Sequence, residues 1–181
     1  MTRILLVGFM AAGKTTLGKA LARDLGLQFV DLDHYIENRY HCSVSQLFAA
    51  RGEEAFRQIE RNMLHEVAEF EDVVISTGGG TPCFFDNMDY MNAQGTTVFL
   101  EAAVDVIHTR LTIARVQRPL VKGKTADELR QYITNMLERR NPYYTRAHYT
   151  FCANHLEDSE QVANSVDRFK SEILYILRRQ T

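Results

Sequence analysis

The sequence predicts a three-layer α/β sandwich, in which helices cover both faces of a central parallel sheet of about five strands. Two observations support this prediction. Short apolar runs alternate with helical patterns along the chain, and such alternation is typical of parallel sheets. A glycine-rich segment at residues 8–15 lies between the first apolar run and the first helical pattern. In this architecture ligands bind at the carboxyl ends of the strands.

The segment at residues 8–15, GFMAAGKT, has the pattern of a phosphate-binding loop, G-x-x-x-x-G-K-[ST]. RILLV at residues 3–7 predicts a strand before it, and leucines at helical spacing predict a helix after it that ends at Gly26. The backbone N–H groups of such a loop form a nest for the β- and γ-phosphates of a nucleotide. Lys14 adds a mobile positive charge, and Thr15 adds a hydroxyl ligand for Mg²⁺.

The second apolar run, LQFVDLD at residues 27–33, predicts a strand that ends in Asp31 and Asp33. The two-residue period of a strand would place both carboxylates on one side. Because Mg²⁺ on nucleotide phosphates takes one or two protein oxygens, Asp31 joins Thr15 as a candidate, through water, and Ser76 is a candidate for another water. Asp33 is the candidate to accept the proton of a phosphoryl acceptor. Capping of a following helix is the alternative for either aspartate.

The next segment predicts two helical stretches separated by Gly52. The S-x-x-Q spacing at Ser43 is typical of a helix start. Arg57 and Glu60 are three residues apart, and are therefore neighbours on one helix face, so Glu60 can brace Arg57 toward a ligand. The alternative is a solvated helix face with an ordinary ion pair. The apolar stripe of the second stretch lies on another face and consists of Phe56, Ile59, Met63 and Val67.

The β-branched run VVIST at residues 73–77 predicts a strand that ends in three consecutive glycines, Gly78, Gly79 and Gly80. Consecutive glycines let a ligand approach backbone N–H groups without interference from Cβ atoms, which suits a polyhydroxylated small molecule. A plain turn that ends the strand is the alternative.

TTVFLEA from residue 96 predicts another strand, and a helical pattern follows it. Residues 114–124 carry four basic residues and no periodicity, so we expect an exposed, mobile loop there.

A helix from about residue 126 is expected to end at Arg140, because the residue before Pro142 is pushed out of the helical conformation. Arg140 is a candidate ligand for an anion, although a cation at a helix C-terminus is favourable without any ligand. A last strand, HYTFCA, begins at residue 148. The stripe of the terminal helix consists of Val162, Val166, Phe169, Ile173 and Leu177.

The composition is that of a soluble globular protein: 181 residues, 45% hydrophobic and 24% charged, with a formal net charge of -2. This charge does not support a nucleic-acid surface, and no apolar run approaches the length of a membrane span. Three cysteines at wide separations suggest neither a disulfide framework nor a zinc site. We expect a single domain in the cytoplasm.

The order and spacing of these segments resemble those of shikimate kinases, small P-loop kinases of the nucleoside monophosphate kinase type. The resemblance spans nearly the whole chain. It implies a P-loop NTPase fold, with one kinase domain over residues 1–181, a helical substrate-binding insertion at about residues 33–61 and a mobile lid at about residues 112–124. The segments that carry it are GFMAAGKTT, DLD at Asp31, GEEAFRQIE at Gly52, STGGG at Ser76, RPL at Arg118 and RRNPYY at Arg139.

The resemblance implies transfer of the γ-phosphate of ATP, with Mg²⁺, to the 3-hydroxyl of shikimate on the route to chorismate and the aromatic amino acids. Asp33 would hold substrate hydroxyls and serve as base or orienter. Arg57 and Arg140 would clamp the substrate carboxylate, because the guanidinium fork matches a carboxylate. Gly78, Gly79 and Gly80 would line the substrate.

On the nucleotide side, the resemblance implies that Arg118 comes from the lid, cancels charge on the transferring phosphoryl group and excludes water. Together with Lys14 and Asp33, it forms the expected catalytic set. Arg110 would lie against adenine, and Asn154 falls in the adenine loop. The phosphates would be held by Gly8, Ala11, Ala12, Gly13, Lys14, Thr15 and Thr16.

Many family members carry glycine where this chain has Ala11, which therefore needs a backbone angle that a residue with Cβ can adopt. Two alternatives remain open. One is a P-loop kinase for another small molecule, such as gluconate, and the other is a nucleotide-binding module without catalysis. Family members of this size are often monomeric, and we expect a monomer that binds neither nucleic acid nor membrane.

Overall fold

The structure, a computed structural model, describes residues 2–114 and 123–174 of the chain. Arg118 and Leu177, both singled out from the sequence, lie outside the described residues. The strands are β1 Arg3–Val7, β2 Gln28–Asp31, β3 Val73–Ser76, β4 Thr96–Glu101 and β5 Tyr149–Cys152. The helices are α1 Lys14–Leu25, α2 Leu32–Tyr40, α3 Val44–Ala68, α4 Asn87–Gln94, α5 Val104–Ile113, α6 Ala126–Tyr144 and α7 Ser159–Phe169, with a short 3₁₀ turn at Thr81–Cys83 and a π turn at Lys170–Leu174.

The five strands form one parallel sheet in the order β2-β3-β1-β4-β5. β1 is central, since it pairs with β3 on one side and with β4 on the other. β3 is buried along its whole length, β1 except at its first residue and β4 except at its two ends, as expected for strands covered on both faces. The fold class predicted from the sequence is confirmed.

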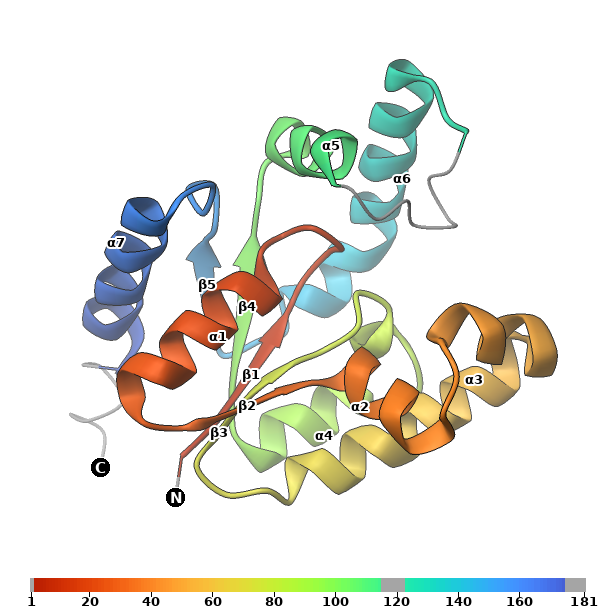
Figure 1. Ribbon diagram of the computed structural model, residues 1–181, viewed down its shortest axis with the longest axis horizontal. Coiled ribbons are helices and arrows are strands. Elements are labelled where there is room, and N and C mark those ends of the chain that lie inside the picture. Colours follow the sequence, from red (N-terminus) through yellow and green to blue (C-terminus); the bar gives the residue numbers. More distant parts are fainter. Residues whose placement is uncertain (1, 115–122, 175–181) are drawn as a thin grey trace.

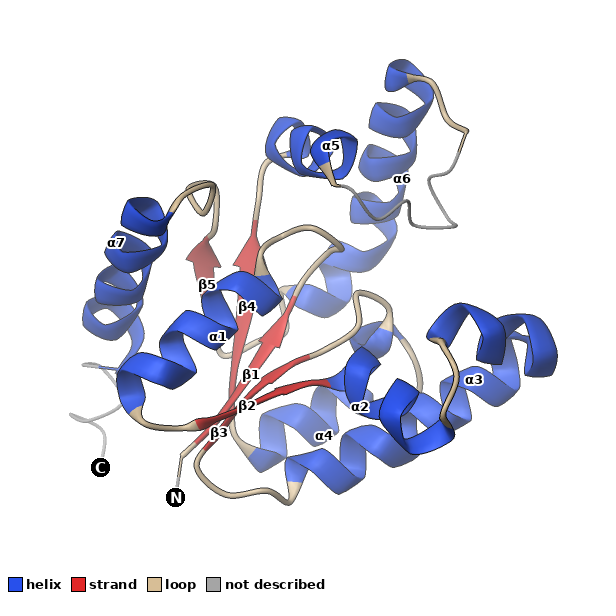
Figure 2. Cartoon of the chain, viewed as in Figure 1, coloured by secondary structure: helices blue, strands red, loops and turns tan. Residues whose placement is uncertain are grey.

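Helices lie on both faces of the sheet (Figure 1). α1 and α7 pack together on one face, and α4 and the C-terminal end of α6 lie on the other. Figure 2 shows that the loops after β1 and β3 leave the same edge of the sheet. These loops carry the phosphate-binding pattern and the three glycines, so the topology brings the two motifs together.

The position expected for Asp33 is wrong, because β2 ends at Asp31 and α2 begins at Leu32. Asp33 therefore lies in the first turn of a helix, and the two-residue period of a strand does not apply to it. Asp31 is the N-cap residue of α2, with a side chain that accepts from the His34 N–H at 3.4 Å. Asp31 therefore caps α2, as the alternative predicted, while its other oxygen accepts from Thr15 Oγ1.

The expected end of α6 is also wrong: the helix continues through Pro142 to Tyr144. A proline inside a helix loses one backbone hydrogen bond and crowds the preceding turn. Here it lies close to the C-terminus, and the turn that it begins carries Tyr144, which is fully buried. Burial of this large side chain offsets the local cost, so tertiary packing overrides the sequence rule.

Two further features refine the expectations. The helical region from Ser43 begins with the predicted capping box and is interrupted at Gly52, whose φ of 77° is left-handed. α4 was not expected, because its sequence, NMDYMNAQ, lacks a clear apolar stripe. Its apolar contribution to the core comes from Met88 and Met91.

Candidate active site

The phosphate loop closes tightly between β1 and α1. Gly8 and Gly13 have φ values of 141° and 104°, which favour glycine. Contacts impose the same requirement, because a Cβ on Gly8 would lie 2.7 Å from the Leu100 carbonyl oxygen and one on Gly13 would lie 2.3 Å from Leu156 Cδ1. The predicted loop is therefore packed against β4 and against the segment after β5.

Lys14, the first residue of α1, is buried and bends back over this loop. Its Nζ donates to the carbonyl oxygens of Gly8 at 2.8 Å and Phe9 at 2.9 Å. The ammonium group thus lies over the concave side of the loop, where it can exchange carbonyl oxygens for phosphate oxygens. Thr16, two residues further into α1, is exposed.

Ala11 adopts a φ of 59°, in the left-handed region. This is an angle that a residue with Cβ can adopt, at a cost of about 1–2 kcal/mol relative to right-handed conformations. The carbonyl oxygens of Ala11 and of buried Ala12 both accept from Arg110 Nη1, at 3.3 and 3.2 Å. The arginine therefore holds the strained part of the loop.

Arg110, expected against adenine, connects several segments here. Its Nη2 donates to the Ala153 carbonyl oxygen at 2.9 Å and to Glu157 Oε1 at 2.7 Å. Asn154 lies in the same segment after β5, where its Oδ1 accepts from the Ala103 N–H at 2.9 Å. Contact of Arg110 and Asn154 with adenine stays a prediction.

Three hydroxyl and carboxyl groups gather at the edge of the sheet beside the phosphate loop. Thr15 Oγ1 donates to Asp31 Oδ2 at 2.8 Å, while Asp31 Oδ1 caps α2. Ser76, at the end of β3, pairs in register with Asp31. Such hard oxygen donors fit Mg²⁺. Among the described residues, no group of three or more His, Cys, Asp or Glu side chains could hold a metal by itself.

The three glycines after β3 are surrounded by charged side chains. A Cβ on Gly78 would lie 3.0 Å from Asp33 Oδ1, one on Gly79 would lie 3.4 Å from Arg140 Nη1, and one on Gly80 would lie 2.8 Å from Arg57 Nη2. Any larger residue would thus collide with the groups around it or displace them. Asp33, Arg57 and Arg140 converge here from three different helices, α2, α3 and α6.

Arg57 is held rigidly rather than solvated, because its side chain is only 12% exposed. Its Nη1 donates to Glu60 Oε2 at 2.8 Å, and the guanidinium lies 4.1 Å from the centre of the Phe84 ring. Glu60 is buried and also accepts from Thr81 Oγ1 at 2.6 Å. These contacts rule out the solvated-face alternative for Arg57.

One donor of this arginine is left over. Arg57 Nε is buried and has no hydrogen-bond partner within the described part of the chain. A buried donor without an acceptor is costly, and an anionic ligand could supply one.

Arg140 lies near Gly79, with its guanidinium 5.6 Å from the centre of the Phe9 ring. Cys83 lies within the field of both arginines. Burial raises the pKa of this thiol to about 11, although Arg140 and Arg57 lower it. Cys83 is therefore an uncharged thiol at neutral pH, and it adds no negative charge beside the two arginines.

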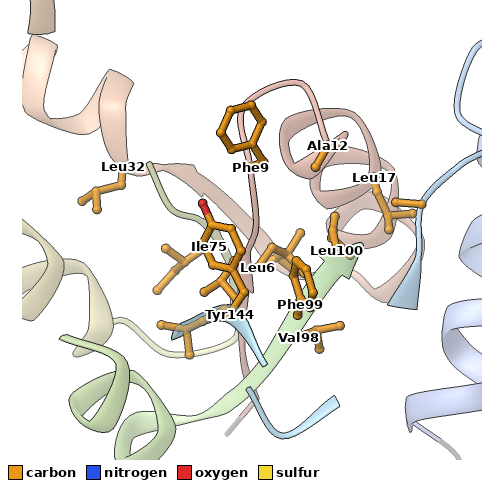
Figure 3. Packing of buried hydrophobic residues seen from close by; sticks show 14 of the residues in the cluster. Leu6, Phe9, Ala12, Leu17, Leu32, Ile75, Val98, Phe99, Leu100 and Tyr144 are labelled. Carbon is orange, nitrogen blue, oxygen red and sulfur yellow. The ribbon is translucent and has the colours of Figure 1, made fainter. Parts of the chain in front are cut away.

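Sequence reasoning missed several groups at this site, namely Thr81, Cys83, Phe84 and Tyr144. The position of Thr81 directly after the glycines was the one available signal. Tyr144 belongs to the RRNPYY segment, but it was given no role, because the helix was expected to end before it. Figure 3 shows Tyr144 beside Phe99, and their ring centroids are 5.2 Å apart.

A phosphate loop at the end of the central strand, beside three glycines that two arginines and an aspartate approach, defines a P-loop kinase that acts on a small anionic acceptor. The sequence profile of the shikimate kinase family matches residues 10–170. The chain belongs to the shikimate kinase family. No helix within the described residues is long and apolar enough to cross a membrane.

Similar proteins agree with this assignment. A shikimate kinase from Bacteroides fragilis is 58% identical over 170 residues, which cover 94% of this chain and 95% of that protein. The crystal structure of shikimate kinase from Bacteroides thetaiotaomicron has a TM-score of 0.93 and 57% identity, and covers 95% of this chain and 98% of its own. A shikimate kinase from Acinetobacter baumannii in complex with shikimate has a TM-score of 0.83 and 30% identity, with 97% and 94% coverage.

Proposed function

We propose that this enzyme transfers the γ-phosphoryl group of ATP to the 3-hydroxyl of shikimate, and releases shikimate 3-phosphate and ADP. The observation that carries the proposal is the convergence of Asp33, Arg57 and Arg140 on the three glycines, next to the phosphate loop. Shikimate carries three hydroxyls and one carboxylate. Its chemistry matches a site with two guanidinium groups and one carboxylate.

In this assignment the two arginines bind the substrate carboxylate. Arg57 is already fixed by Glu60, so it pays little entropy when it binds. Its unpartnered Nε gains an acceptor. Arg140 approaches Gly79 from α6, and the two forks orient the ring.

The phosphoryl transfer follows from this orientation. The oxygen of the 3-hydroxyl forms a bond to the γ-phosphorus, while the bond between that phosphorus and the β–γ bridging oxygen breaks and ADP leaves. Asp33 accepts the hydroxyl proton. Lys14 moves from the carbonyl oxygens of Gly8 and Phe9 to the phosphate oxygens, where it balances their charge.

Thr15, Asp31 and Ser76 are the residues we assign to Mg²⁺, the two latter through water. When bound, the ion neutralises charge on the β- and γ-phosphates. The Thr15–Asp31 hydrogen bond supports this assignment, since it keeps both oxygens at one point beside the loop.

Arg118 and the lid at about residues 112–124 are proposed from the sequence. Arg118→Ala is expected to lower turnover by up to about 10³-fold, the scale of charge-stabilising arginines in phosphoryl transfer, with a smaller effect on the KM for ATP. An unchanged turnover would remove Arg118 from the catalytic set. A helical insertion at about residues 33–61 completes the proposed single domain.

We also propose a cytoplasmic monomer that binds neither nucleic acid nor membrane. The net charge of -2 and the odd, widely spaced cysteines support this proposal. Size-exclusion chromatography with light scattering would test the oligomeric state.

The activity is tested by measuring ADP release with Mg²⁺ and ATP in the presence of shikimate, gluconate, a panel of nucleoside monophosphates, or no acceptor. We expect stimulation by shikimate alone, with a turnover of about 1–100 per second. Stimulation by another acceptor would contradict the assigned substrate. Equal ADP release with and without every acceptor would favour a nucleotide-binding module.

A further inference from the structure

We infer that Tyr144 is a positioning residue of the active site, which fixes Gly79 between the phosphate loop and Arg140. This inference rests on the proposed function, because Gly79 and Arg140 belong to the assigned substrate site. We do not assign Tyr144 a direct role as a charged or nucleophilic group at the substrate. It acts through the backbone of Gly79, which its hydroxyl holds.

Tyr144 follows Arg140 by four residues on α6, so the two side chains lie on the same face of the helix. The tyrosine is fully buried, and its ring packs against Phe99 of β4. The last turn of α6 is thereby anchored to the sheet. This anchoring also fixes the direction from which Arg140 reaches the glycines.

The hydroxyl of Tyr144 donates to the Gly79 carbonyl oxygen at 2.5 Å. Gly79 lies between the phosphate loop and the assigned substrate site. A Cβ built on it would be 3.2 Å from the backbone nitrogen of Met10, in the loop, and 3.4 Å from Arg140 Nη1. One hydrogen bond therefore links α6 to the residue that separates the phosphate loop from the arginine.

The tyrosine remains a donor at every pH at which the enzyme would be assayed. Burial raises the pKa of its hydroxyl, against a lowering effect of Arg140, and Cys83 raises it further. A buried hydroxyl requires a partner; the Gly79 carbonyl oxygen accepts its hydrogen bond, and the Arg140 side chain also hydrogen-bonds with this hydroxyl.

A simple core-filling role is the competing explanation, and the two explanations predict different results for Tyr144→Phe. Phenylalanine keeps the ring and its packing but removes the donor to Gly79. If Tyr144 only fills space, this variant loses some stability and keeps its kinetic constants. If it positions Gly79, the KM for shikimate rises as well.

The experiment compares Tyr144→Phe with Tyr143→Phe, the same change at the neighbouring, 37% exposed tyrosine. For each full-length variant we would measure kcat, both KM values, shikimate binding by calorimetry and the urea unfolding midpoint. Tyr144→Phe is expected to raise the KM and Kd for shikimate about five-fold, the effect of one lost hydrogen bond of about 1 kcal/mol. The KM for ATP and all constants of Tyr143→Phe should stay at the wild-type values.

Unchanged shikimate constants in Tyr144→Phe, or an equal rise in both KM values, would overturn the inference. Assays are run well below the unfolding midpoint of each variant, and calorimetry is carried out on the same folded samples, so lost stability does not mimic lost binding.

Arg140→Lys, measured in parallel, separates this result from the proposed function. If Arg140→Lys weakens shikimate binding while Tyr144→Phe does not, only the role of Tyr144 fails; if neither does, the assigned substrate site fails.

Discussion

Arg110 and Glu157 form an ion pair, with Nη2 2.7 Å from Oε1, that ties the phosphate loop to the segment after β5. The same guanidinium donates to the carbonyl oxygens of Ala11 and Ala12. Burial raises the pKa of Glu157, but its hydrogen bonds with Arg110 and the Leu156 N–H outweigh burial and lower that pKa overall. Glu157 is therefore a carboxylate at neutral pH that holds Arg110 against the loop.

We expect Glu157→Gln to raise the KM for ATP, because Arg110 then holds the loop less firmly. Glu157 is 48% exposed, so the pair contributes about 0.5–1 kcal/mol after solvent screening, or about a two- to five-fold change in KM. Steady-state kinetics with ATP and shikimate varied separately would measure it. The control is Glu160→Gln, an exposed glutamate in the first turn of α7. A lower KM for ATP would instead mean that the ion pair holds Arg110 away from the nucleotide.

Ala11→Gly is expected to stabilise the protein, since glycine enters the left-handed region without the Cβ penalty. Part of the gain is lost to the greater freedom of the unfolded chain, and the net effect is about 0.5–1 kcal/mol, or about 1–4 °C in Tm. Thermal unfolding would measure it. Ala163→Gly, at an exposed position inside α7, should shift Tm downward. A downward shift for both variants would contradict strain at Ala11.

Replacement of Arg57 by lysine should raise the KM for shikimate. The guanidinium group of arginine can bind Glu60 and the substrate carboxylate at the same time, whereas the ammonium group of lysine is a single point charge. The loss of one charge-assisted hydrogen bond, about 1.5–3 kcal/mol, corresponds to a change of about ten-fold or more. The matched control is Arg61→Lys, on the same helix, whose partner is Asp86. Equal constants for the two variants would return Arg57 to an ordinary structural role.

His65 should make stability depend on pH. Burial and, to a smaller extent, the charge of Arg61 lower the pKa of His65, whereas the charges of Asp86 and Glu69 raise it. The imidazole ring stacks on the Tyr90 ring, with the ring centroids 3.6 Å apart. In the unfolded chain the histidine has a pKa of about 6.5 and binds the proton more strongly than in the folded protein. The contribution of His65 to the free energy of unfolding is therefore fully present above pH of about 6.5. It is lost as the pH falls toward the lower pKa of the folded state. Urea unfolding at a series of pH values should show a weaker pH dependence below 6.5 in His65→Phe than in wild type.

Much of the fold could be predicted from local sequence. Gly8 and Gly13 at fixed spacing, ahead of an apolar helix stripe, can form few structures other than a phosphate loop. The capping box at Ser43 and the break at Gly52 were equally readable. These features depend on backbone geometry and on hydrogen bonds between residues a few positions apart, so they are encoded locally.

Residue types also indicated the nature of the site. Three glycines after a buried strand indicated a polyhydroxylated small molecule, whereas an acceptor with a carboxylate was implied only by the family resemblance. The sequence could not show that Asp33, Arg57 and Arg140 converge on Gly78, Gly79 and Gly80, because their helices are far apart along the chain. The resemblance supplied that grouping, and the geometry accounts for it through the positions of α2, α3 and α6.

Local rules determined the strands, the helix starts and the phosphate loop, because short-range spacing and capping suffice for them. Tertiary structure decided where packing opposes those rules. Tyr144 buries enough surface to carry α6 through Pro142, and Arg110 holds Ala11 in a left-handed conformation. In each case a contact between distant segments outweighs a local preference of about 1–3 kcal/mol, which no reading of neighbouring residues can reveal.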